Sequence, residues 1–349
     1  MKKYIRSSST IVFTIGNKKI IGYGSMQSIF NENDFKKIYM LLEFLEKEKN
    51  ESEINDFLKD NDIDYEVFEL CLDKKFITDN KYVLKNDEHS ADFKNRLYLD
   101  CCYERSELIL NKIRNSTIIN VGCGGIGNYL LYAYSSFMPK QVIMIDGDIV
   151  SESNLNRQIL FDLDDIGKKK TEILKLKLKK RFPSVKFESV PKFSTKEELS
   201  NVLNGIKDKS NCIIVISGDS SKTVMETTKV AAQYQIPCLN VGYLNDYSII
   251  GPFFIPSISA CPFCSDIGAD YDDNSFNEFK NFNSFYRAPS SFINSSMASS
   301  MALIDIFNYF SEDYQNINSL NKRIGINNRT FEVMRIGVQK NESCRICKK

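Results

Sequence analysis

The chain has 349 residues, 42% hydrophobic and 26% charged, which is typical of a globular protein with enough material for two or three domains. Its 46 basic and 45 acidic residues leave a net charge of +1, which excludes a global field that would attract nucleic acid or a membrane surface. No apolar run approaches the ~20 residues that span a bilayer and no secretory signal is evident, so we expect a cytoplasmic protein without nucleic-acid or membrane partners.

Residues 1–90 carry the pattern of a small mixed module. Two β-branched runs, residues 10–14 and 19–23, flank a turn and predict a β-hairpin. Apolar residues at helical spacing follow, and residues 76–84 are typical of a second hairpin with Asp79 and Asn80 at its turn. The predicted helices cover residues 35–45, 54–58 and 65–72. Strands, helices and a wing-like hairpin together predict a winged-helix-like domain.

The third predicted helix of this domain argues against DNA binding. Residues 65–73 are acidic and contain no arginine, whereas a helix that reads a duplex needs basic side chains for phosphates and base edges. A peptide-docking module, in which a peptide strand pairs with an exposed hairpin edge, is the preferred interpretation. A dimerisation or packing domain stays open as the alternative.

A polar stretch, residues 85–94, follows and contains His89, the only histidine. A single histidine excludes His-based metal sites and argues against a Ser/His/Asp triad. We interpret His89 as a solvated linker residue and place the domain boundary here, with domains at residues 1–90 and 91–349.

Residues 117–128 predict a strand, a tight turn and the start of a helix. The turn contains Gly122, Gly124, Gly125 and Gly127, and glycine lets a phosphate approach the backbone N–H groups at the helix N-terminus. A second predicted strand, residues 141–145, leads to Asp146 and Asp148. Asp146 stands 19 residues beyond Gly127 (146 − 127), where a Rossmann-type acid binds a ribose hydroxyl.

The residues after this acid indicate a phosphoryl- or nucleotidyl-transfer enzyme and argue against a dehydrogenase. Arg157 follows the carboxylates, and Lys170 lies in a basic run that opens the next predicted helix. Such cations stabilise charge that develops on an α-phosphate and a leaving pyrophosphate. A further strand, residues 211–217, ends before Asp219, which we expect to hold Mg²⁺ on the phosphates. A role as the cap of the following helix is the alternative, and the two roles are compatible.

Two C-x-x-C pairs, about 80 residues apart, predict a structural zinc site. The four candidate ligands are Cys261, Cys264, Cys344 and Cys347. Four thiolates complete a tetrahedral shell and leave no open position for chemistry. A redox role for the pairs is the competing interpretation. Between the pairs, residues 271–294 form a polar loop that we interpret as a lid, followed by a helix at 295–307 with small residues on one face.

Together these motifs resemble the ThiF/MoeB adenylating superfamily, which includes the adenylation core of ubiquitin-activating enzymes. A closer resemblance, to the MccB-type peptide nucleotidyltransferases of microcin C biosynthesis, rests on residues 122–128, 157–161, 242–246 and 319–326. It extends to the front domain, which in that family is a winged-helix-like peptide clamp. The implied fold is an α/β, Rossmann-like ThiF/MoeB adenylation domain with an N-terminal peptide clamp and a four-cysteine zinc site.

The resemblance implies a homodimer that modifies the C-terminal Asn of a short ribosomal peptide. An NTP activates the carboxylate as an acyl-adenylate, the Asn amide closes to a succinimide, and its nitrogen attacks a second nucleotide to give a P–N bond. ATP and CTP both remain open as the nucleotide. The implied nucleotide-binding residues are Gly122, Gly124, Gly125, Gly127, Asp146, Asp148, Asn154 and Gln158. The implied catalytic residues are Arg157, Lys170, Asp219 (through Mg²⁺) and Arg96, the last acting in the partner's site.

Two other functions remain as alternatives. One is ThiF/MoeB-type adenylation of the C-terminus of a ubiquitin-like sulfur-carrier protein, although the simpler members of that group need no front domain. The other is a non-catalytic peptide-binding scaffold, which the presence of Arg157, Lys170 and Asp219 argues against. No cysteine matches a ubiquitin-thioester position, which disfavours transfer to a carrier through a thioester.

Overall fold

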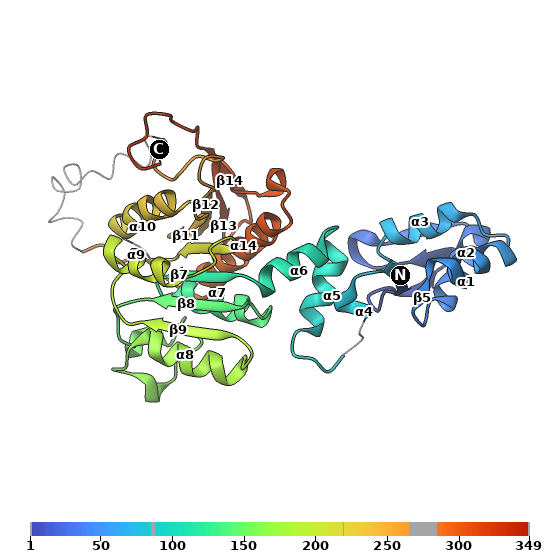
Figure 1. The fold of residues 1–349 in the computed structure, drawn as a ribbon, viewed down its shortest axis with the longest axis horizontal. Helices are drawn as coiled ribbons and strands as arrows, with labels where there is room; N and C mark the ends of the chain where they lie inside the picture. The colour runs from blue at the N-terminus through green and yellow to red at the C-terminus, as the bar shows by residue number, and fades with distance from the viewer. Residues whose placement is uncertain (1, 85–87, 219, 266–284, 348–349) are drawn as a thin grey trace. The chain divides into compact units, whose positions relative to one another are not determined.

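The computed structural model describes residues 2–84, 88–218, 220–265 and 285–347 (Figure 1). The chain divides into two compact units, Met1–Asn111 and Lys112–Lys349. The division lies further along the chain than the polar stretch at which we expected it. The first unit therefore includes the segment that connects the front module to the glycine-containing strand.

Among its described residues the first unit contains two small antiparallel sheets, five helices and most of a sixth, α6, which ends just beyond the division. In one sheet the central strand β1 pairs with β5 and β6, and in the other β3 pairs with β2 and β4. The strands are β1 (Lys3–Arg6), β2 (Val12–Ile15), β3 (Lys18–Ile21), β4 (Ser28–Phe30), β5 (Lys49–Asn50) and β6 (Ile77–Thr78). The helices are α1 (Glu32–Phe44), α2 (Glu51–Asp60), α3 (Tyr65–Asp73), α4 (Lys81–Leu84), α5 (Phe93–Cys102) and α6 (Ser106–Arg114).

The predicted first hairpin and three helices are confirmed, and each has a local cause. β2 and β3 pair antiparallel across the turn. The Asn31 side chain accepts a hydrogen bond from the backbone of Asp34 at the start of α1, and Asn50 forms a capping box with Glu53 at the start of α2. The helices bury one apolar face each in a shared core that includes Leu41.

The predicted second hairpin at residues 76–84 is wrong. β6 pairs with β1, and Lys81–Leu84 forms the short helix α4. Asn80 accounts for the difference, because its side-chain oxygen accepts from the backbone N–H of Tyr82 at 2.9 Å and starts a helical turn. The Asn80 amide also donates to Asp100 and to Ser106, which ties α4 to α5 and α6.

The second unit is built on a mixed eight-stranded sheet in the order β14-β13-β12-β11-β10-β7-β8-β9. The segment β11-β10-β7-β8-β9 is parallel, and β12, β13 and β14 extend it in antiparallel fashion. This arrangement confirms the predicted α/β fold. The strands are β7 (Thr117–Val121), β8 (Gln141–Ile145), β9 (Lys186–Val190), β10 (Cys212–Ile216), β11 (Cys238–Leu244), β12 (Tyr247–Phe254), β13 (Lys322–Asn327) and β14 (Val333–Gly337).

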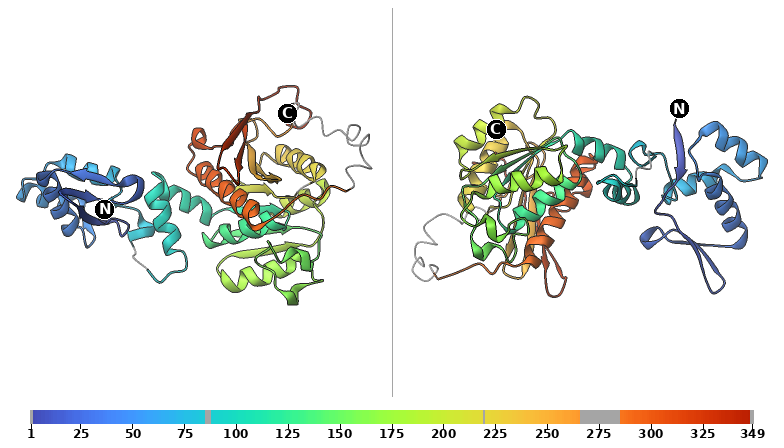
Figure 2. Two further views of the ribbon diagram at one scale, coloured as in Figure 1. Left: turned by 180° about the vertical axis from the view of Figure 1, so that it is seen from behind. Right: turned by 90° about the horizontal axis from the view of Figure 1, so that it is seen from below.

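Helices cover both faces of the parallel part of this sheet, as the alternation of buried side chains requires. Ile143 and Ile145 of β8 pack into one core with α9 and α10, whereas Val142 and Met144 pack into another with α7 and α8. α14 lies beside α7 (Figure 2), and the two are linked by Ser299, whose hydroxyl donates to the Ile126 carbonyl. The helices are α7 (Gly125–Ser136), α8 (Lys170–Arg181), α9 (Lys196–Gly205), α10 (Ser221–Tyr234) and α14 (Phe292–Phe310).

Within the described part of the chain, no helix is both long enough and apolar enough to cross a bilayer.

Candidate active site and metal centre

The glycine turn, residues 122–127, connects β7 to α7 at the carboxyl edge of the parallel strands. Gly122 has φ +96°, and a Cβ atom on it would lie 2.7 Å from the backbone nitrogen of Gly218. Any larger residue at this position would therefore have both an unfavourable backbone conformation and a steric clash. Gly124 has no heavy atom within 4 Å of its Cβ position, so this side of the turn is open to a ligand at the positive end of α7.

Asp146 is fixed directly against the glycine turn. One carboxylate oxygen accepts from the backbone N–H of Cys123 at 2.6 Å, and the other accepts from the N–H of Asp148 at 2.8 Å. Both carboxylate oxygens thus accept backbone hydrogen bonds. The sequence-predicted ribose-binding acid thus lies next to the predicted phosphate-binding turn.

Lys170 is buried, with 6% of its surface exposed, and its ammonium lies 3.0 Å from the Asp148 carboxylate. The backbone N–H of Lys170 also donates to the carbonyl of Asp148 at 3.1 Å. These contacts explain why a basic residue is tolerated at the N-terminus of α8, where the helix dipole opposes it. They also bring the start of α8 to the same edge of the sheet as Asp146.

The loop at residues 151–161 is held against the glycine turn by a side chain of α7. Asn128 donates to the carbonyl of Cys123 at 3.2 Å and accepts from the N–H of Leu160 at 2.8 Å. Within this loop Asn154 accepts from the N–H of Ser151 at 3.1 Å, and Arg157 donates to the carbonyl of Ser153 at 2.8 Å. The predicted residues Asn154, Arg157 and Gln158 are therefore positioned beside the turn.

Three buried polar atoms near the turn have no hydrogen-bond partner in the described structure: Asn120 Oδ1, Gln158 Oε1 and Ser295 Oγ. Ser295 comes from α14, and its Oγ lies 2.5 Å from the Cβ position of Gly125, with Arg157 Cγ at 3.6 Å from the same point. Sequence analysis noted the small residues of this helix without selecting Ser295. Unpartnered buried atoms are costly in a folded protein, so these three are candidates for contact with a ligand.

Phe193 is a residue that sequence analysis missed. It follows β9, its side chain is 67% exposed, and its ring carbon Cδ2 lies 2.7 Å from the Cβ position of Gly147, between Asp146 and Asp148. An exposed aromatic ring beside the predicted ribose-binding acid could offer a stacking surface to a nucleobase. The sequence pattern that could have identified Phe193 is an aromatic residue just after a parallel strand, but the strand β9 was not predicted.

Asp219, predicted to hold Mg²⁺, lies outside the described residues. Ser217 and Gly218 immediately before it are described, and the Ser217 hydroxyl donates to the Gly122 carbonyl at 2.8 Å. They line a cavity of about 320 Å³ at the carboxyl ends of β10 and β11, together with Ile126, Asn240, Tyr243 and Arg323. This cavity adjoins the glycine turn and has room for a second substrate.

Most of the predicted lid at residues 271–294 also lies outside the described residues. Tyr286 belongs to its described part and lines the same cavity, where its hydroxyl donates to the Asn245 side chain at 3.0 Å.

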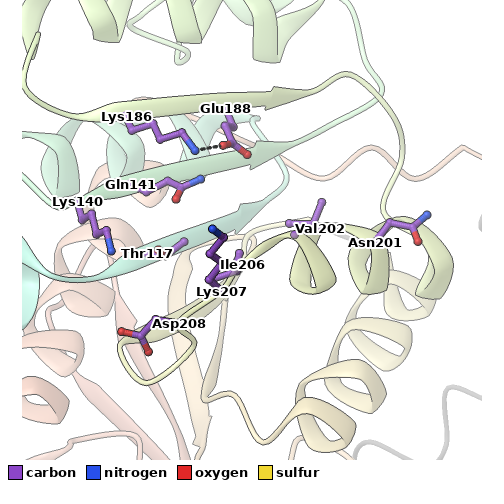
Figure 3. Close-up of a pocket in the computed structure, with 11 residues that line it drawn as sticks. Thr117, Lys140, Gln141, Lys186, Glu188, Asn201, Val202, Ile206, Lys207 and Asp208 are labelled. Carbon is purple, nitrogen blue, oxygen red and sulfur yellow. Dashed lines mark ion pairs between the residues drawn. The ribbon is translucent and has the colours of Figure 1, made fainter.

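A different cavity, of about 450 Å³, lies at the amino ends of β7, β8 and β9 (Figure 3). None of the residues predicted to bind a nucleotide, a metal or a peptide lines it.

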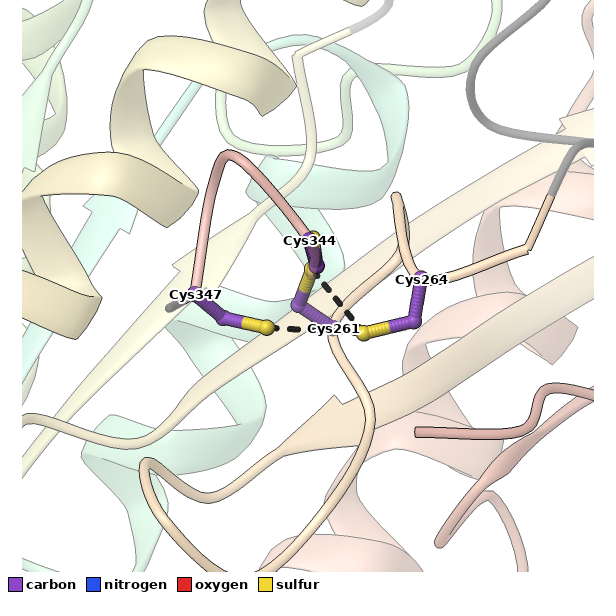
Figure 4. A group of neighbouring side chains, drawn as sticks. All are labelled: Cys261, Cys264, Cys344 and Cys347. Carbon is purple, nitrogen blue, oxygen red and sulfur yellow. Dashed lines mark hydrogen bonds between the residues drawn. The ribbon is translucent and has the colours of Figure 1, made fainter. Parts of the chain in front are cut away.

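The four predicted zinc ligands converge (Figure 4), and all four sulfur atoms lie within 4.8 Å of one another. Cys261 Sγ lies 3.7 Å from the sulfurs of both Cys264 and Cys344, and Cys264 Sγ lies 3.4 Å from that of Cys347. Four sulfurs at ~2.3 Å from one tetrahedral ion are ~3.8 Å apart, so the geometry fits zinc. Burial raises the pKa of the Cys347 thiol to about 12, and a bound divalent cation would reverse this by favouring thiolates.

Arg96, predicted to act in a partner's site, is buried in the first unit. Its Nε lies 3.3 Å from the carboxylate of Asp92, and its other nitrogens donate to the carbonyl of Tyr82 and the hydroxyl of Ser90. The guanidinium is thus bound within its own chain, and its action in a partner's site stays a prediction.

Comparison with known proteins shows a match of residues 100–346 to the ThiF family. A probable molybdopterin-synthase adenylyltransferase of Porphyra purpurea is 31% identical over 145 residues, covering 41% of this chain and 34% of the relative. The adenylyltransferase and sulfurtransferase UBA4 of Lodderomyces elongisporus is 29% identical over 175 residues, covering 45% and 36%. The matched region therefore spans about a third of the length of these curated relatives.

Solved structures show the same fold over the whole chain. The E. coli MccB complex with MccA-N7isoASN has a TM-score of 0.82 at 24% identity and covers 99% of both chains. E. coli MccB with ATP has a TM-score of 0.81 at 23% identity and the same coverage. The structure of PaaA is less similar, with a TM-score of 0.67 at 16% identity, covering 95% of this chain and 98% of PaaA.

Proposed function

The chain belongs to the ThiF family, and from this we propose that it is an ATP-dependent adenylating enzyme that activates the C-terminal carboxylate of a peptide. In the proposed reaction a carboxylate oxygen attacks the α-phosphorus of the nucleotide. The bond from that phosphorus to the bridging oxygen breaks, and pyrophosphate leaves.

The contacts at the carboxyl edge of the sheet support this chemistry. The open side of Gly124 and the N-terminus of α7 offer backbone donors to the phosphates, and Asp146 is placed to accept from a ribose hydroxyl. Arg157 and Lys170 supply positive charge beside them, where it favours the charge that develops on the α-phosphate and the leaving pyrophosphate.

The substrate that we propose is a short ribosomal peptide ending in Asn. The observation that carries this is the similarity of fold to MccB along 99% of both chains, which includes the first unit. After activation, the Asn side-chain nitrogen attacks the acyl carbon, AMP leaves and a succinimide forms. The succinimide nitrogen then attacks the α-phosphorus of a second nucleotide and releases pyrophosphate, which leaves a P–N bond in a microcin C-type product.

The first unit offers a surface for such a peptide. Its sheet β2-β3-β4 exposes the apolar side chains of Ile15 and Ile29, and Ile11 and Tyr23 are exposed just outside the strands. β2 and β4 are edge strands with unpaired backbone groups, which suit the addition of a peptide strand. We therefore propose that residues 1–90 form the peptide clamp.

Two metals belong to the proposal. Zinc would be held by Cys261, Cys264, Cys344 and Cys347 and would be structural, because four thiolates leave no open position. Mg²⁺ would bind through Asp219 and would neutralise charge on the phosphates.

The protein would act in the cytoplasm as a homodimer, with either ATP or CTP as the nucleotide. The exposed ring of Phe193 would stack on the base, and stacking alone accepts purines and pyrimidines alike.

The decisive experiment follows pyrophosphate release with synthetic peptides that end in Asn. We expect release to depend on the peptide and to fall at least ~100-fold in Arg157→Ala and Asp219→Ala. The matched control is Lys180→Ala, an exposed basic residue of α8. Unchanged turnover in both site variants would contradict the proposal, and failure of the unmodified protein to bind any nucleotide would favour a peptide-binding scaffold.

Adenylation of a sulfur-carrier protein is the second candidate function. It is favoured by the curated relatives, whose names describe a probable molybdopterin-synthase adenylyltransferase and an adenylyltransferase and sulfurtransferase. Pyrophosphate release with a carrier protein ending in Gly-Gly, together with no release on Asn-ended peptides, would decide for it.

A further inference from the structure

The cavity of about 450 Å³ in Figure 3 lies at the opposite edge of the sheet from the glycine turn. Thr117 and Gln141 stand at the starts of β7 and β8, whereas the glycine turn follows the end of β7. The other wall of the cavity is the end of α9 and the segment 206–208. The cavity is therefore separate from the proposed active site.

One of the two carboxylates of this cavity is ion-paired, whereas the other keeps its negative charge. Glu188 forms an ion pair with Lys186 at 2.5 Å. Asp208 accepts from the N–H and the hydroxyl of Ser210 at 2.9 and 2.7 Å, and these bonds, assisted by the nearby charge of Lys140, lower the pKa of Asp208. The ammonium of Lys209 donates to the Ile206 carbonyl just beyond α9, which offsets the negative end of that helix.

Several basic and amide side chains of the cavity have no partner in the described protein. Four side chains that line the cavity have no hydrogen bond or ion pair to the described protein: Lys140, Gln141, Asn201 and Lys207. Lys140 precedes β8 and Lys207 follows α9, so the two ammonium groups come from opposite walls (Figure 3). Among the described residues, the cavity is thus lined by two exposed lysines without an ion pair and by one carboxylate, that of Asp208, which no ion pair neutralises.

We infer that this cavity binds a small anion carrying two or more phosphate groups, with Lys140 and Lys207 as its charge partners. An ammonium binds a phosphate oxygen through a charge-assisted hydrogen bond, and the two lysines could each bind one phosphate group. Gln141 and Asn201 supply further donors to its oxygens. Val202 and Ile206 give the cavity an apolar side that a nucleoside attached to the phosphates would cover.

The test on the unmodified protein is a lysine-acetylation footprint read by mass spectrometry, with inorganic pyrophosphate as the ligand. Pyrophosphate should slow the acetylation of Lys140 and Lys207, and it should leave Lys175 and Lys180 on the exposed face of α8 unaffected. Equal labelling of all four lysines with and without pyrophosphate would overturn the inference. Because the readout is specific for each lysine, failure of the proposed adenylation would not affect it.

A pair of matched double variants gives the second readout. In calorimetry, Lys140→Gln with Lys207→Gln should weaken pyrophosphate binding at this cavity at least ~10-fold, since two charge-assisted hydrogen bonds are lost. Lys175→Gln with Lys180→Gln removes the same charge elsewhere and should bind as the unmodified protein does. Equal binding by both double variants would contradict the inference, and replacing pyrophosphate by ATP tests whether a nucleoside is accepted.

Discussion

The ammonium of Lys170 and the carboxylate of Asp148 lie 3.0 Å apart, and this pair joins the N-terminus of α8 to the end of β8. Its partners differ in environment, because the Lys170 side chain is 7% exposed and that of Asp148 is 52% exposed. The lysine is thus the buried member, and without its partner its charge would be held in a poorly solvated place.

Lys170→Met should therefore cause a large loss of turnover and only a moderate loss of stability. Removing one partner of a half-exposed pair costs about 1–2 kcal/mol of unfolding free energy, whereas loss of a cation at the phosphates costs ~100-fold in rate. Thermal unfolding and pyrophosphate release measure the two effects. Lys175→Met, on the exposed face of the same helix, is the control. Turnover within twofold of the unmodified protein would rule out a role for Lys170 at the phosphates.

Phe193→Ala should weaken ATP binding about 10-fold, because one stacking surface for the base is lost. Binding of tripolyphosphate, which has no base, should not change, and calorimetry with both ligands separates the two results. Phe331→Ala is the matched control, since that ring is exposed to a similar extent in the β13–β14 connection. Equal losses for ATP and tripolyphosphate would show that Phe193 acts on the fold of the site and not on the base.

Gly125→Ala should destabilise the protein by about 1–3 kcal/mol, because the new methyl group would lie 2.5 Å from the buried Ser295 Oγ. Ser295→Gly removes that oxygen and the Cβ behind it, so the double variant should recover a large part of the loss. Urea unfolding of the two single variants and the double variant measures the coupling. Strictly additive effects would mean that α7 and α14 do not pack as described.

Removal of the metal should open the C-terminal part of the second unit. Metal analysis should find about one zinc per chain, and Cys344→Ser should lose it together with several kcal/mol of stability. Cys261, Cys264 and Cys344 belong to the same core as α9 and α10, so the loss should reach those helices in hydrogen exchange. As a control, the Cys71→Ser variant, which replaces a buried cysteine of the first unit outside the cluster, should retain the zinc.

The parts of the fold that the sequence predicted are those with a local cause. The glycine turn, the apolar strands β7, β8 and β10 and the C-x-x-C pairs each lie within a few residues, where periodicity and glycine spacing identify them. Asn80 does lie in a turn, as predicted, but its side chain caps the short helix α4. The strand before it, β6, pairs with the distant strand β1 and not with residues 81–84. A pairing over about 70 residues leaves no local signal.

The candidate site was also predicted only in part, and the residues that were missed lie in other segments of the chain. Asp146, Arg157 and Lys170 lie within 25 residues of one another and form one charge pattern that can be read from the sequence. Phe193 and Ser295 belong to segments that reach the site only through the order of the strands and the packing of α14. A single exposed phenylalanine or buried serine has no distinctive pattern in the chain.

The cysteine cluster also sets the order in which this protein can mature on the ribosome. Cys261 and Cys264 leave the exit tunnel about 80 residues before Cys344 and Cys347 (344 − 264 = 80), and all four are needed to complete the cluster. The first unit can complete its core while synthesis continues, since its residues are contiguous. The core under α9 and α10 must wait until Cys344 and Cys347 have been synthesised, and under the proposal of a structural zinc its supply would then act as a checkpoint for newly made chains.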